Sequence, residues 1–476
     1  MPENDTNLDS ILRHNDVRIQ DVRIISLTGL NISIMEHFHY FELHEDIFSQ
    51  NISGRLSILD ASNLPKNLAL SGQEMLFITF GSPGTDTITQ GFVIDKISER
   101  IILKDGSSTL YDIFFVFPTF INSILNTVNK SYSGKISETV RDIWNNNINP
   151  DNSEDAIKLF TEPTVGDHNV VIPGWHPIPT INWLCKRAVG VSNKTKADYI
   201  FYQDLDGFKF VSLSSLFSRD VVQVYENFPG RAGMSRDEET DSPDLGKAQR
   251  NIEKMVIKGF DNSREIMKGT FASKMMIHDI TTKSFESFGY SYAENFDAEN
   301  SLNGHSLQPM LASFYSPHLN SKQYLIPRQS GLFGGVSTLQ LDSGGTMEVI
   351  DNPNNDRSEW WVQTHDANIN QFKYSSVEIV VQGDTNRRIG DKVILIFGDT
   401  TNVGTEDAAA VPVDKEVSGN YIISKIKHTI TPESGHSMSL RLCKDSYAEP
   451  LPNIWLNDEI DPGLGHPAWS TGENFA

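Results

Sequence analysis

The sequence predicts a β-rich α+β fold in which one sheet domain occurs twice, with helical and mixed segments inserted. Three observations lead to this prediction. Two long stretches are rich in β-branched and aromatic residues and are broken by glycines, which is typical of strands and tight turns. Between these stretches, apolar residues recur at helical spacing. The second β-rich stretch also resembles the first, strand for strand.

Residues 17–117 are predicted to form the first sheet domain, after an N-terminal arm of residues 1–16. The strand signal is alternation of apolar and polar residues within runs of β-branched and aromatic side chains. Glycines between the runs indicate the turns. The expected strands include Val22–Ile25, Asn31–Met35, His37–Leu43 and Met75–Phe80.

Residues 118–244 are predicted to form a helical and mixed α/β domain that ends in an acidic linker. Three helices are expected, because apolar residues recur every three or four positions over 121–128, 136–144 and 180–189. Asp206-Gly207 lies between two apolar strands, which is a strong hairpin signal. Residues 229–243 have no periodicity and carry clustered charges, so we expect an exposed linker there.

Residues 245–290 plus 372–447 are predicted to form the second sheet domain. The insertion 291–371 is rich in loops, and residues 448–476 form an extended tail with several prolines. Tight turns are expected at Gly331–Gly335 and Ser343–Gly345. The expected strands of this domain are Met255–Phe260, Gly269–Ile280, Val377–Gln382, Lys392–Phe397, Tyr421–Thr431 and Met438–Leu442.

An internal repeat connects the two sheet domains. Phe92–Ile97 aligns with Tyr421–Ile426, and the returning strand Tyr111–Ile113 aligns without a gap on Leu440–Leu442. One strand upstream, the run that starts at Gly72 matches the run that starts at Gly390. Three strands in the same order, with glycine at matching turns, indicate duplication of a domain.

Composition excludes several classes of protein. The 476 residues include 40 Lys+Arg and 62 Asp+Glu, a formal charge of −22, which argues against a protein that binds nucleic acid by neutralising phosphates. No apolar run is long enough for a membrane span, and Met1–Ser10 is acidic rather than a secretory signal, so we expect no membrane insertion. Cys185 and Cys443 are too few for a disulfide framework or a thiolate metal site, and we expect both to be buried.

No motif nominates a catalytic, cofactor-binding or metal-binding residue, so we predict a non-enzymatic protein without cofactor or metal. His44-Glu45-Asp46 lacks the second histidine of a zinc helix, and no Gly-x-Ser-x-Gly elbow is present. Other candidates have simpler interpretations: turns for Ser330–Gly335 and Asp204–Gly207, partly exposed strand residues for His37 and His39, and core packing, carbohydrate platforms or interface anchors for Trp183, Trp360 and Trp361.

An ordered set of segments resembles the baseplate hub protein of contractile-tailed bacteriophages. The resemblance covers most of residues 17–447, and parts of it are shared with the first portion of type VI secretion spikes and with late-control proteins. Those spikes continue into a needle, so we expect the needle here to be another chain. The segments that carry the resemblance are Ile172–Ala188, Ala197–Tyr202, Phe208–Leu213, Gly269–Ile280 and Gly419–Tyr447.

This resemblance implies two antiparallel β-barrel tube domains per subunit and a homotrimer that forms a pseudo-six-fold ring. The implied partners are the central spike protein, a tail tube or tube-initiator ring protein, and other baseplate proteins. The implied location is the tail baseplate of the virion, assembled in the host cytoplasm. During ejection DNA would pass through the lumen without specific binding, and an acidic lumen would suit that passage.

Two alternatives remain open at this point. One is a tail-associated peptidoglycan hydrolase whose site lies in residues 291–371, and a peptidoglycan zymogram would reveal it. The other is a host-surface binding module on a β scaffold, which would bind glycans or cells as an isolated monomer. Neither alternative has a motif in the sequence.

Overall fold

The computed structural model is β-rich, since 51% of the residues it describes lie in strands and 22% in helices, so the predicted fold class is confirmed at this level. No helix in the described part of the chain is long and apolar enough to cross a bilayer. The predicted arm 1–16, linker 229–243, glycine-rich tracts 331–335 and 343–345, and the tail from residue 450 lie outside the described residues. The structure describes residues 18–449 except 69, 83–86, 104–107, 150–156, 192–195, 228–249, 260, 281, 297–299, 308–320, 329–338, 342–346, 350–357, 399–412 and 433–434.

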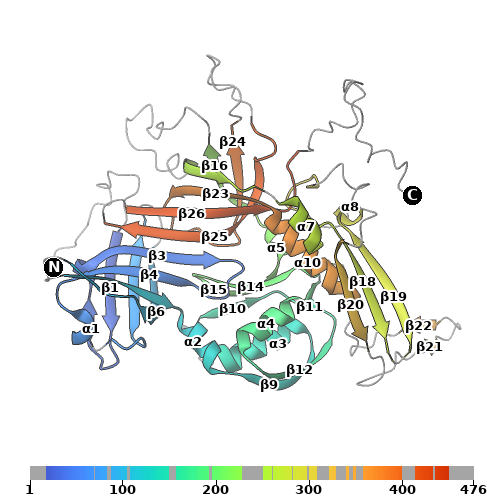
Figure 1. Cartoon of the computed structure of the whole chain (residues 1–476), viewed down its shortest axis with the longest axis horizontal. Helices are drawn as coiled ribbons and strands as arrows, with labels where there is room; N and C mark the ends of the chain where they lie inside the picture. The colour runs from blue at the N-terminus through green and yellow to red at the C-terminus, as the bar shows by residue number, and fades with distance from the viewer. Residues whose placement is uncertain are drawn as a thin grey trace, which may run out of the picture.

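A sheet of 14 strands forms the body of the molecule (Figure 1). Its first part, here named the first sheet region, has the order β3-β4-β8-β6-β5-β1-β2. Alternating residues such as Leu76, Ile78 and Phe80 point into its apolar core. The elements are β1 (Arg18–Ile25), β2 (Asn31–Ser33), η2 (Met35–His37), β3 (Phe38–Asp46), β4 (Ser53–Asp60), α1 (Leu64–Asn67), β5 (Met75–Gly81), β6 (Ile88–Ile97), β7 (Ile101–Ile102) and β8 (Thr109–Val116).

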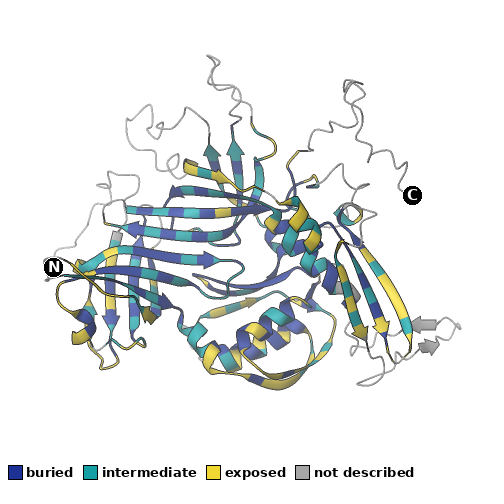
Figure 2. Ribbon diagram, viewed as in Figure 1, coloured by how far each residue is buried: buried dark blue, intermediate teal, exposed yellow. Residues whose placement is uncertain are grey.

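The remaining strands of this sheet form the second sheet region, with the order β17-β23-β26-β25-β24-β16. The inward side chains of these strands form a second apolar core. Figure 2 shows buried residues along the ribbons of β23, β25 and β26. Lys392–Phe397 is predicted with the observed bounds, and the other predicted strands of this region differ by a few residues at their ends. The strands are β16 (Val221–Asn227), β17 (Ile252–Ile257), β23 (Ser375–Gln382), β24 (Lys392–Phe397), β25 (Gly419–Thr431) and β26 (Gly435–Lys444).

Five strands of the two regions correspond in chain order and in pairing. The order β3-β4-β8-β6-β5 of the first region matches β17-β23-β26-β25-β24 of the second. A bulge lies between Ile94 and Lys96 of β6, and its counterpart lies between Ile423 and Lys425 of β25. A second bulge occurs near the start of both β3 and β17. Bulges are positional features of a fold, so two matching bulges support the internal repeat.

The strand pairing corrects the alignment made from the sequence. Leu76 pairs with Phe92 as Val393 pairs with Tyr421, whereas the alignment from the sequence matches Met75 with Val393. A shift of one residue moves every side chain to the other face of the sheet, and the pairing resolves it.

The returning strand needs a larger correction. Phe115 and Leu442 occupy equivalent positions opposite Ile94 and Ile423, because the hairpin of the second region is two residues shorter. The gapless alignment of this hairpin is therefore wrong by two residues. A shift of two residues leaves every apolar residue on the same face of the strand. The alternation of apolar and polar residues therefore cannot reveal it.

The sheet does not close into a barrel within the described residues. Its strand path ends at β17 on one side and at β2 on the other. The strands that flank the five shared ones also differ, because β1 pairs antiparallel with β5, whereas β16 pairs parallel with β24.

Residues 118–217 contribute helices and small sheets below the main sheet (Figure 1). The three predicted helices are confirmed, and their apolar faces share a core with the hairpin β14–β15. The hairpin predicted at Asp206-Gly207 is also confirmed. The elements are α2 (Pro118–Leu125), β9 (Val128–Gly134), α3 (Ile136–Ile143), η3 (Trp144–Ile148), β10 (Lys158–Thr161), β11 (Thr164–Val165), β12 (His168–Trp175), α4 (Pro177–Cys185), β13 (Val189–Gly190), β14 (Tyr199–Asp204), β15 (Gly207–Ser212) and α5 (Leu213–Phe217).

A separate three-stranded sheet, β19-β18-β20, lies beside the main sheet. Helix α10 connects the two, since the Gln363 side chain donates to the Ser273 carbonyl of β18 at 3.0 Å and Phe372 joins the core of the second sheet region. These elements are α7 (Asn262–Lys268), β18 (Ala272–Asp279), β19 (Ser284–Ser291), α8 (Tyr292–Asn295), β20 (Gln323–Arg328), β21 (Leu339–Leu341), β22 (Met347–Val349) and α10 (Ser358–Tyr374).

Candidate interface at the seam of the two sheet regions

The two sheet regions are joined by one antiparallel strand pair, here named the seam. Lys425–Ile430 of β25 pairs with Phe41–Asp46 of β3. The residues of the pair are more than 370 positions apart in the chain, so the seam is a long-range contact. Because strands alternate, the seam presents one polar face and one buried face.

Ion pairs cover the polar face and extend across both regions. Glu42 contacts Lys427 and lies 3.2 Å from Arg55, while Lys425 lies 3.7 Å from Asp46. Although burial opposes it, hydrogen bonds from Lys427 and Tyr40 lower the pKa of Glu42. This ion-paired face consists of Lys258, Arg441, Lys425, Lys427, Arg55, Glu378, Asp46, Glu42 and Asp112.

The ion-paired face is nearly balanced, with five basic and four acidic members, although the whole chain has a formal charge of −22. Glu378 accepts from Arg441 at 2.6 Å and from Lys258 at 2.9 Å, and Arg55 also lies 3.6 Å from Asp112. Each of these five basic side chains is therefore within ion-pair distance of a carboxylate.

The buried face of the seam holds a row of four polar side chains. Ser82 Oγ lies 2.6 Å from His436 Nδ1, His436 Nε2 lies 3.0 Å from His428 Nδ1, and His428 Nε2 lies 3.3 Å from Glu45 Oε1. Both histidines and Glu45 are completely buried. The row crosses from one sheet region to the other, since Glu45 and Ser82 belong to the first and the histidines to the second.

Burial controls the protonation of this row. It raises the pKa of Glu45 to about 8, against the opposing influence of Arg388 and a backbone hydrogen bond from Leu205. It lowers the pKa of His428 to about 3 and that of His436 well below its usual value. At neutral pH Glu45 therefore donates to His428, His428 donates to His436, and His436 donates to Ser82. This order gives every shared hydrogen one donor and one acceptor.

The row contains the residue types of a serine-based catalytic site, but its position gives it another role. Glu45, His428 and His436 have no exposed surface, so a substrate has no access to them. A hydrogen-bonded polar network in a low-dielectric core instead specifies one packing arrangement. We therefore interpret the row as a lock that sets how the two sheet regions meet.

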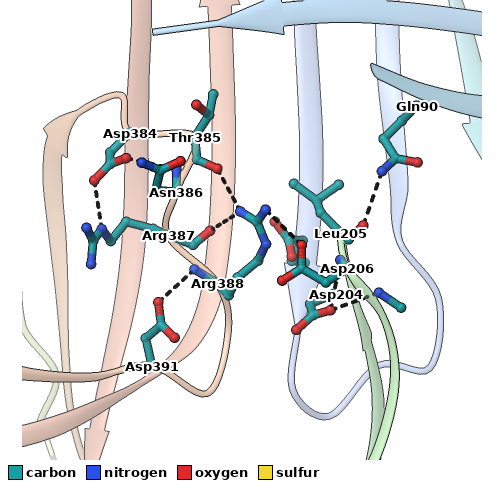
Figure 3. Close-up of polar contacts among 12 residues, drawn as sticks. Gln90, Asp204, Leu205, Asp206, Asp384, Thr385, Asn386, Arg387, Arg388 and Asp391 are labelled. Carbon is teal, nitrogen blue, oxygen red and sulfur yellow. Dashed lines mark hydrogen bonds and ion pairs between the residues drawn. The ribbon is translucent and has the colours of Figure 1, made fainter. Parts of the chain in front are cut away.

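The tip of the β14–β15 hairpin closes the end of the seam (Figure 3). The carbonyl of Leu205 accepts from Gln90 of β6 at 3.1 Å, and Asp206 pairs with Arg388 at 3.0 Å. Arg388 also donates to the Thr385 carbonyl at 2.7 Å, which orders the loop before β24. The hairpin tip therefore contacts both sheet regions.

Apart from one bridge beside the start of β17, two strand edges have no partner strand in the described part of the chain where the seam would repeat. In the seam, Leu43 of β3 is fully buried, whereas its counterpart Ile257 on β17 is 51% exposed. Ile430 of β25 is buried, whereas Ile101 and Ile102 at the corresponding end of the first region are 60% and 72% exposed. Within the described residues no strand pairs with β6 beyond Val93 on the side where β25 receives β3.

The residues weighed from the sequence are scattered over the fold. His37 lies in the turn η2 rather than in a strand, with its ring near the Leu59 carbonyl and Ser62. Among the described residues, no three histidines, cysteines or carboxylates gather in a group that could hold a metal. Arg187 stacks between Trp183 and Trp361, at 3.7 and 4.3 Å from their rings, so these tryptophans connect α4 to α10. Cys185 and Cys443 are buried, as expected.

Sequence reasoning missed the buried row. The signal available in the sequence is that His428 lies two residues from both Ile426 and Ile430, on the same face of the strand. This position indicates that His428 is buried. It does not reveal that Glu45 and Ser82, from distant parts of the chain, form hydrogen bonds with the two histidine rings.

The fold is shared with a solved tail protein. No family model matches the chain. The crystal structure of the tail protein from Neisseria meningitidis MC58 has the same fold, with a TM-score of 0.51 and 11% identity, over 90% of this chain and 97% of that one. The chain thus has the fold of a tail protein.

A curated relative indicates a more specific class of tail protein. The probable baseplate hub protein gp334 of Vibrio phage KVP40 is 22% identical over 435 residues, which cover 89% of this chain and 93% of the relative. The resemblance to baseplate hub proteins is therefore confirmed. These relatives indicate a structural protein of a phage tail or baseplate hub.

Proposed function

We propose that the protein is the structural hub of a contractile-tail baseplate, assembled in the host cytoplasm. Three chains form a pseudo-six-fold ring that joins the tail tube, or its initiator ring, to the central spike and to other baseplate proteins. The ring is not an enzyme, and DNA passes through it during ejection. In this assembly the two sheet regions are the duplicated tube domains, and each completes its barrel-like sheet against a neighbour.

The observation that carries this proposal is the seam together with its two unpaired counterparts. Within one chain, β3 of the first region pairs with β25 of the second. The counterpart of β3 is β17, and the counterpart of β25 is the β6–β7 edge. Pairing of β17 in one chain with the β6–β7 edge of the next therefore repeats the seam between chains. Such head-to-tail contacts close into a ring, and three chains supply six similar sheet regions.

Exposed apolar residues support this pairing. Val256, Ile257, Ile101, Ile102 and Leu103 are all exposed and lie on or next to the two open edges. An open, apolar strand edge is a template for association, and soluble proteins normally protect such edges with charges or covering segments. A neighbouring chain would bury these side chains as Leu43 and Ile430 are buried in the seam.

We assign the ion-paired face to the lumen of the ring. The opposite face of the sheet packs on the apolar cores and the buried row, so the ion-paired face is the broad polar surface shared by both regions. A lining whose cations are already paired with carboxylates releases few counterions on contact with DNA, so it binds DNA weakly. The proposed lumen is thus balanced in charge rather than acidic.

We retain the division of the chain into 17–117, 118–244, 245–290 plus 372–447, and 291–371 as part of this proposal, with two exchanges: β16 of the second segment joins the second sheet region, and β18 and β19 form a sheet with β20 of the insertion. The tail 448–476 is assigned to contacts with the spike or a neighbouring baseplate protein. Its prolines restrict the free chain, so docking costs less conformational entropy.

The test is the mass and symmetry of the purified full chain, alone and with its spike. Light scattering and class averages of electron micrographs should show three chains in a ring with near six-fold appearance. A chain that stays monomeric with the spike present would overturn the proposal.

A further inference from the structure

A cavity of about 150 Å³ lies at the bulge of β25, on the border of the ion-paired face. Its walls come from β25, β26, the start of β23, the end of α10 and the turn after β3. We name it the bulge pocket. Its lining residues are Asp46, Phe48, Lys373, Ser376, Ser424, Lys425, Arg441 and Cys443.

The lining of the bulge pocket has more cations than anions. Lys373, Lys425 and Arg441 contribute three positive charges, and Asp46 contributes the single negative charge. Arg441 is already held by Glu378 at 2.6 Å, and Lys425 lies 3.7 Å from Asp46, at the outer limit of an ion pair. Facing cations of this kind favour an anion between them.

Lys373 has no carboxylate partner among the described residues. Its ammonium lies 3.7 Å from the centre of the Phe48 ring. Burial lowers the pKa of Lys373, while the nearby Asp46 opposes this change. Lys373 is an exposed residue, so an anion from solution can reach its ammonium and form a charged hydrogen bond with it.

The pocket is not a by-product of the repeated fold. The first sheet region has the same bulge, and Lys96 occupies the position of Lys425 there. However, Phe114 stands where the second region has Arg441, because both residues pair opposite the residue after the bulge. The repeat therefore accounts for the cavity position but not for its cations.

We propose that the bulge pocket binds the carboxylate of an aspartate or glutamate side chain from an acidic peptide segment. Lys373 and Lys425 would contact its oxygens, the hydroxyl of Ser376 would donate a further hydrogen bond, and the Phe48 ring would pack on its methylene groups. The pocket is wide enough for one such group. This inference does not depend on the ring.

The segment has two possible sources with the same chemistry. One is the tail of this chain, since residues 449–476 contain five acids and no Lys or Arg. The other is an acidic segment of a second protein of the baseplate. In either case the bulge pocket would attach an acidic segment beside the seam.

Zero-length carbodiimide cross-linking tests this proposal on the full chain and on intact phage particles. The reagent joins an amine to a carboxylate that touches it, and mass spectrometry identifies the pair. We expect Lys373 to be joined to an acid of residues 449–476 in the isolated chain, or to an acid of another protein in the particle. Lys425 joined to Asp46 serves as the internal positive control.

Two further results would overturn the proposal. One is a cross-link of Lys373 to Asp46 alone, or no cross-link of Lys373 while the control pair forms. The other is protection of Lys373 from acetylation by inorganic phosphate but not by a synthetic peptide of residues 449–476. Lys373→Gln should weaken peptide binding by about tenfold, since a charged hydrogen bond is lost. Lys268→Gln, which removes a lysine already paired with Glu265, should leave binding unchanged.

Discussion

The two sheet regions share five strands and two bulges, yet they use equivalent strands differently. In the first region, β3 is paired at both edges, with β4 on one side and β25 on the other. In the second region, β17 pairs with β23, and its other edge is open apart from one bridge near its start. The short connection from β3 to β4 also contrasts with the long insertion between β17 and β23. Backbone pairing is thus retained, while loops, edges and side chains have diverged.

A repeated backbone can thus supply one contact within the chain and a second contact to a neighbouring chain. The internal seam is stabilised by a buried polar row as well as by strand pairing. The open edges instead carry apolar side chains such as Ile257 and Ile102. Four predictions sharpen this difference.

The largest expected effect is loss of assembly when the open edge is charged. Ile257→Lys places an ammonium where the proposed neighbour would bury an apolar side chain, so the ring should dissociate and the measured mass should fall to one third. The side chain is half exposed in the single chain, so stability should change by only about 0.5 kcal/mol. Light scattering and thermal melting separate the two effects.

Leu125→Lys is the matched control, because Leu125 is 75% exposed on α2, away from both edges. An intact ring for Ile257→Lys would contradict the role of β17, and a broken ring for Leu125→Lys would indicate a non-specific effect of charge.

The second effect is on folding stability. His428→Leu removes a central member of the buried row and leaves Glu45 Oε1 and His436 Nε2 without their partner, which should lower the free energy of unfolding by about 3 kcal/mol. His44→Leu, on the polar face of the same seam, should cost less than about 1 kcal/mol. Urea unfolding measures both, and equal losses would mean that the row does not lock the seam.

The third effect is a pH dependence of stability, to which Glu45 and His428 of the row contribute with opposite sign. Glu45 has a raised pKa of about 8, so the stability it contributes is present below its unfolded value of 4.5 and is lost as pH rises through 8. His428 has a lowered pKa of about 3, so its contribution is present above 6.5 and is lost as pH falls toward 3.

Glu45→Gln isolates the first of these contributions. Between pH 5 and 8, the free energy of unfolding of the natural chain should fall relative to that of Glu45→Gln by about 1 kcal/mol per pH unit. Parallel stability curves for the two proteins, measured by urea unfolding across this range, would show that Glu45 is ionised in the folded chain.

The smallest effect concerns the ion-paired face. Glu378→Gln frees Arg441 and Lys258 in the second region, and Glu42→Gln frees Lys427 in the first while Arg55 keeps Asp112. Each variant should gain weak DNA binding at low salt, with affinity falling roughly as the first or second power of salt concentration. Stability should change by less than about 1 kcal/mol, because the pairs are partly exposed. Unchanged DNA binding by both variants, in a filter assay, would contradict a lining neutralised by its own carboxylates.

Local features of the fold were predictable from the sequence because their causes are local. The strand Lys392–Phe397 and the hairpin at Asp206-Gly207 follow from alternation and from a turn dipeptide. The helices near residues 121, 136 and 180 follow from apolar spacing. The repeat was visible for the same reason, since apolar phase and glycine turns survive in both copies.

Contacts between distant strands were not predictable. The registers of the repeat were wrong by one and two residues, because alternation has a period of two and does not encode hairpin length. The sequence placed His37 and His39 together on a strand, whereas a 3-10 turn and a bulge separate their environments.

The sequence by itself determined the β-rich class, the repeated strand order, the three helices, the absence of a recognisable catalytic motif and the resemblance to baseplate hub proteins. These properties depend on residue type and short-range spacing. Only the tertiary structure decided that β3 joins β25, that Glu45 and Ser82 satisfy two buried histidines, and that three cations meet at one bulge. Such contacts join residues hundreds of positions apart, and their geometry follows from how the packed sheets meet.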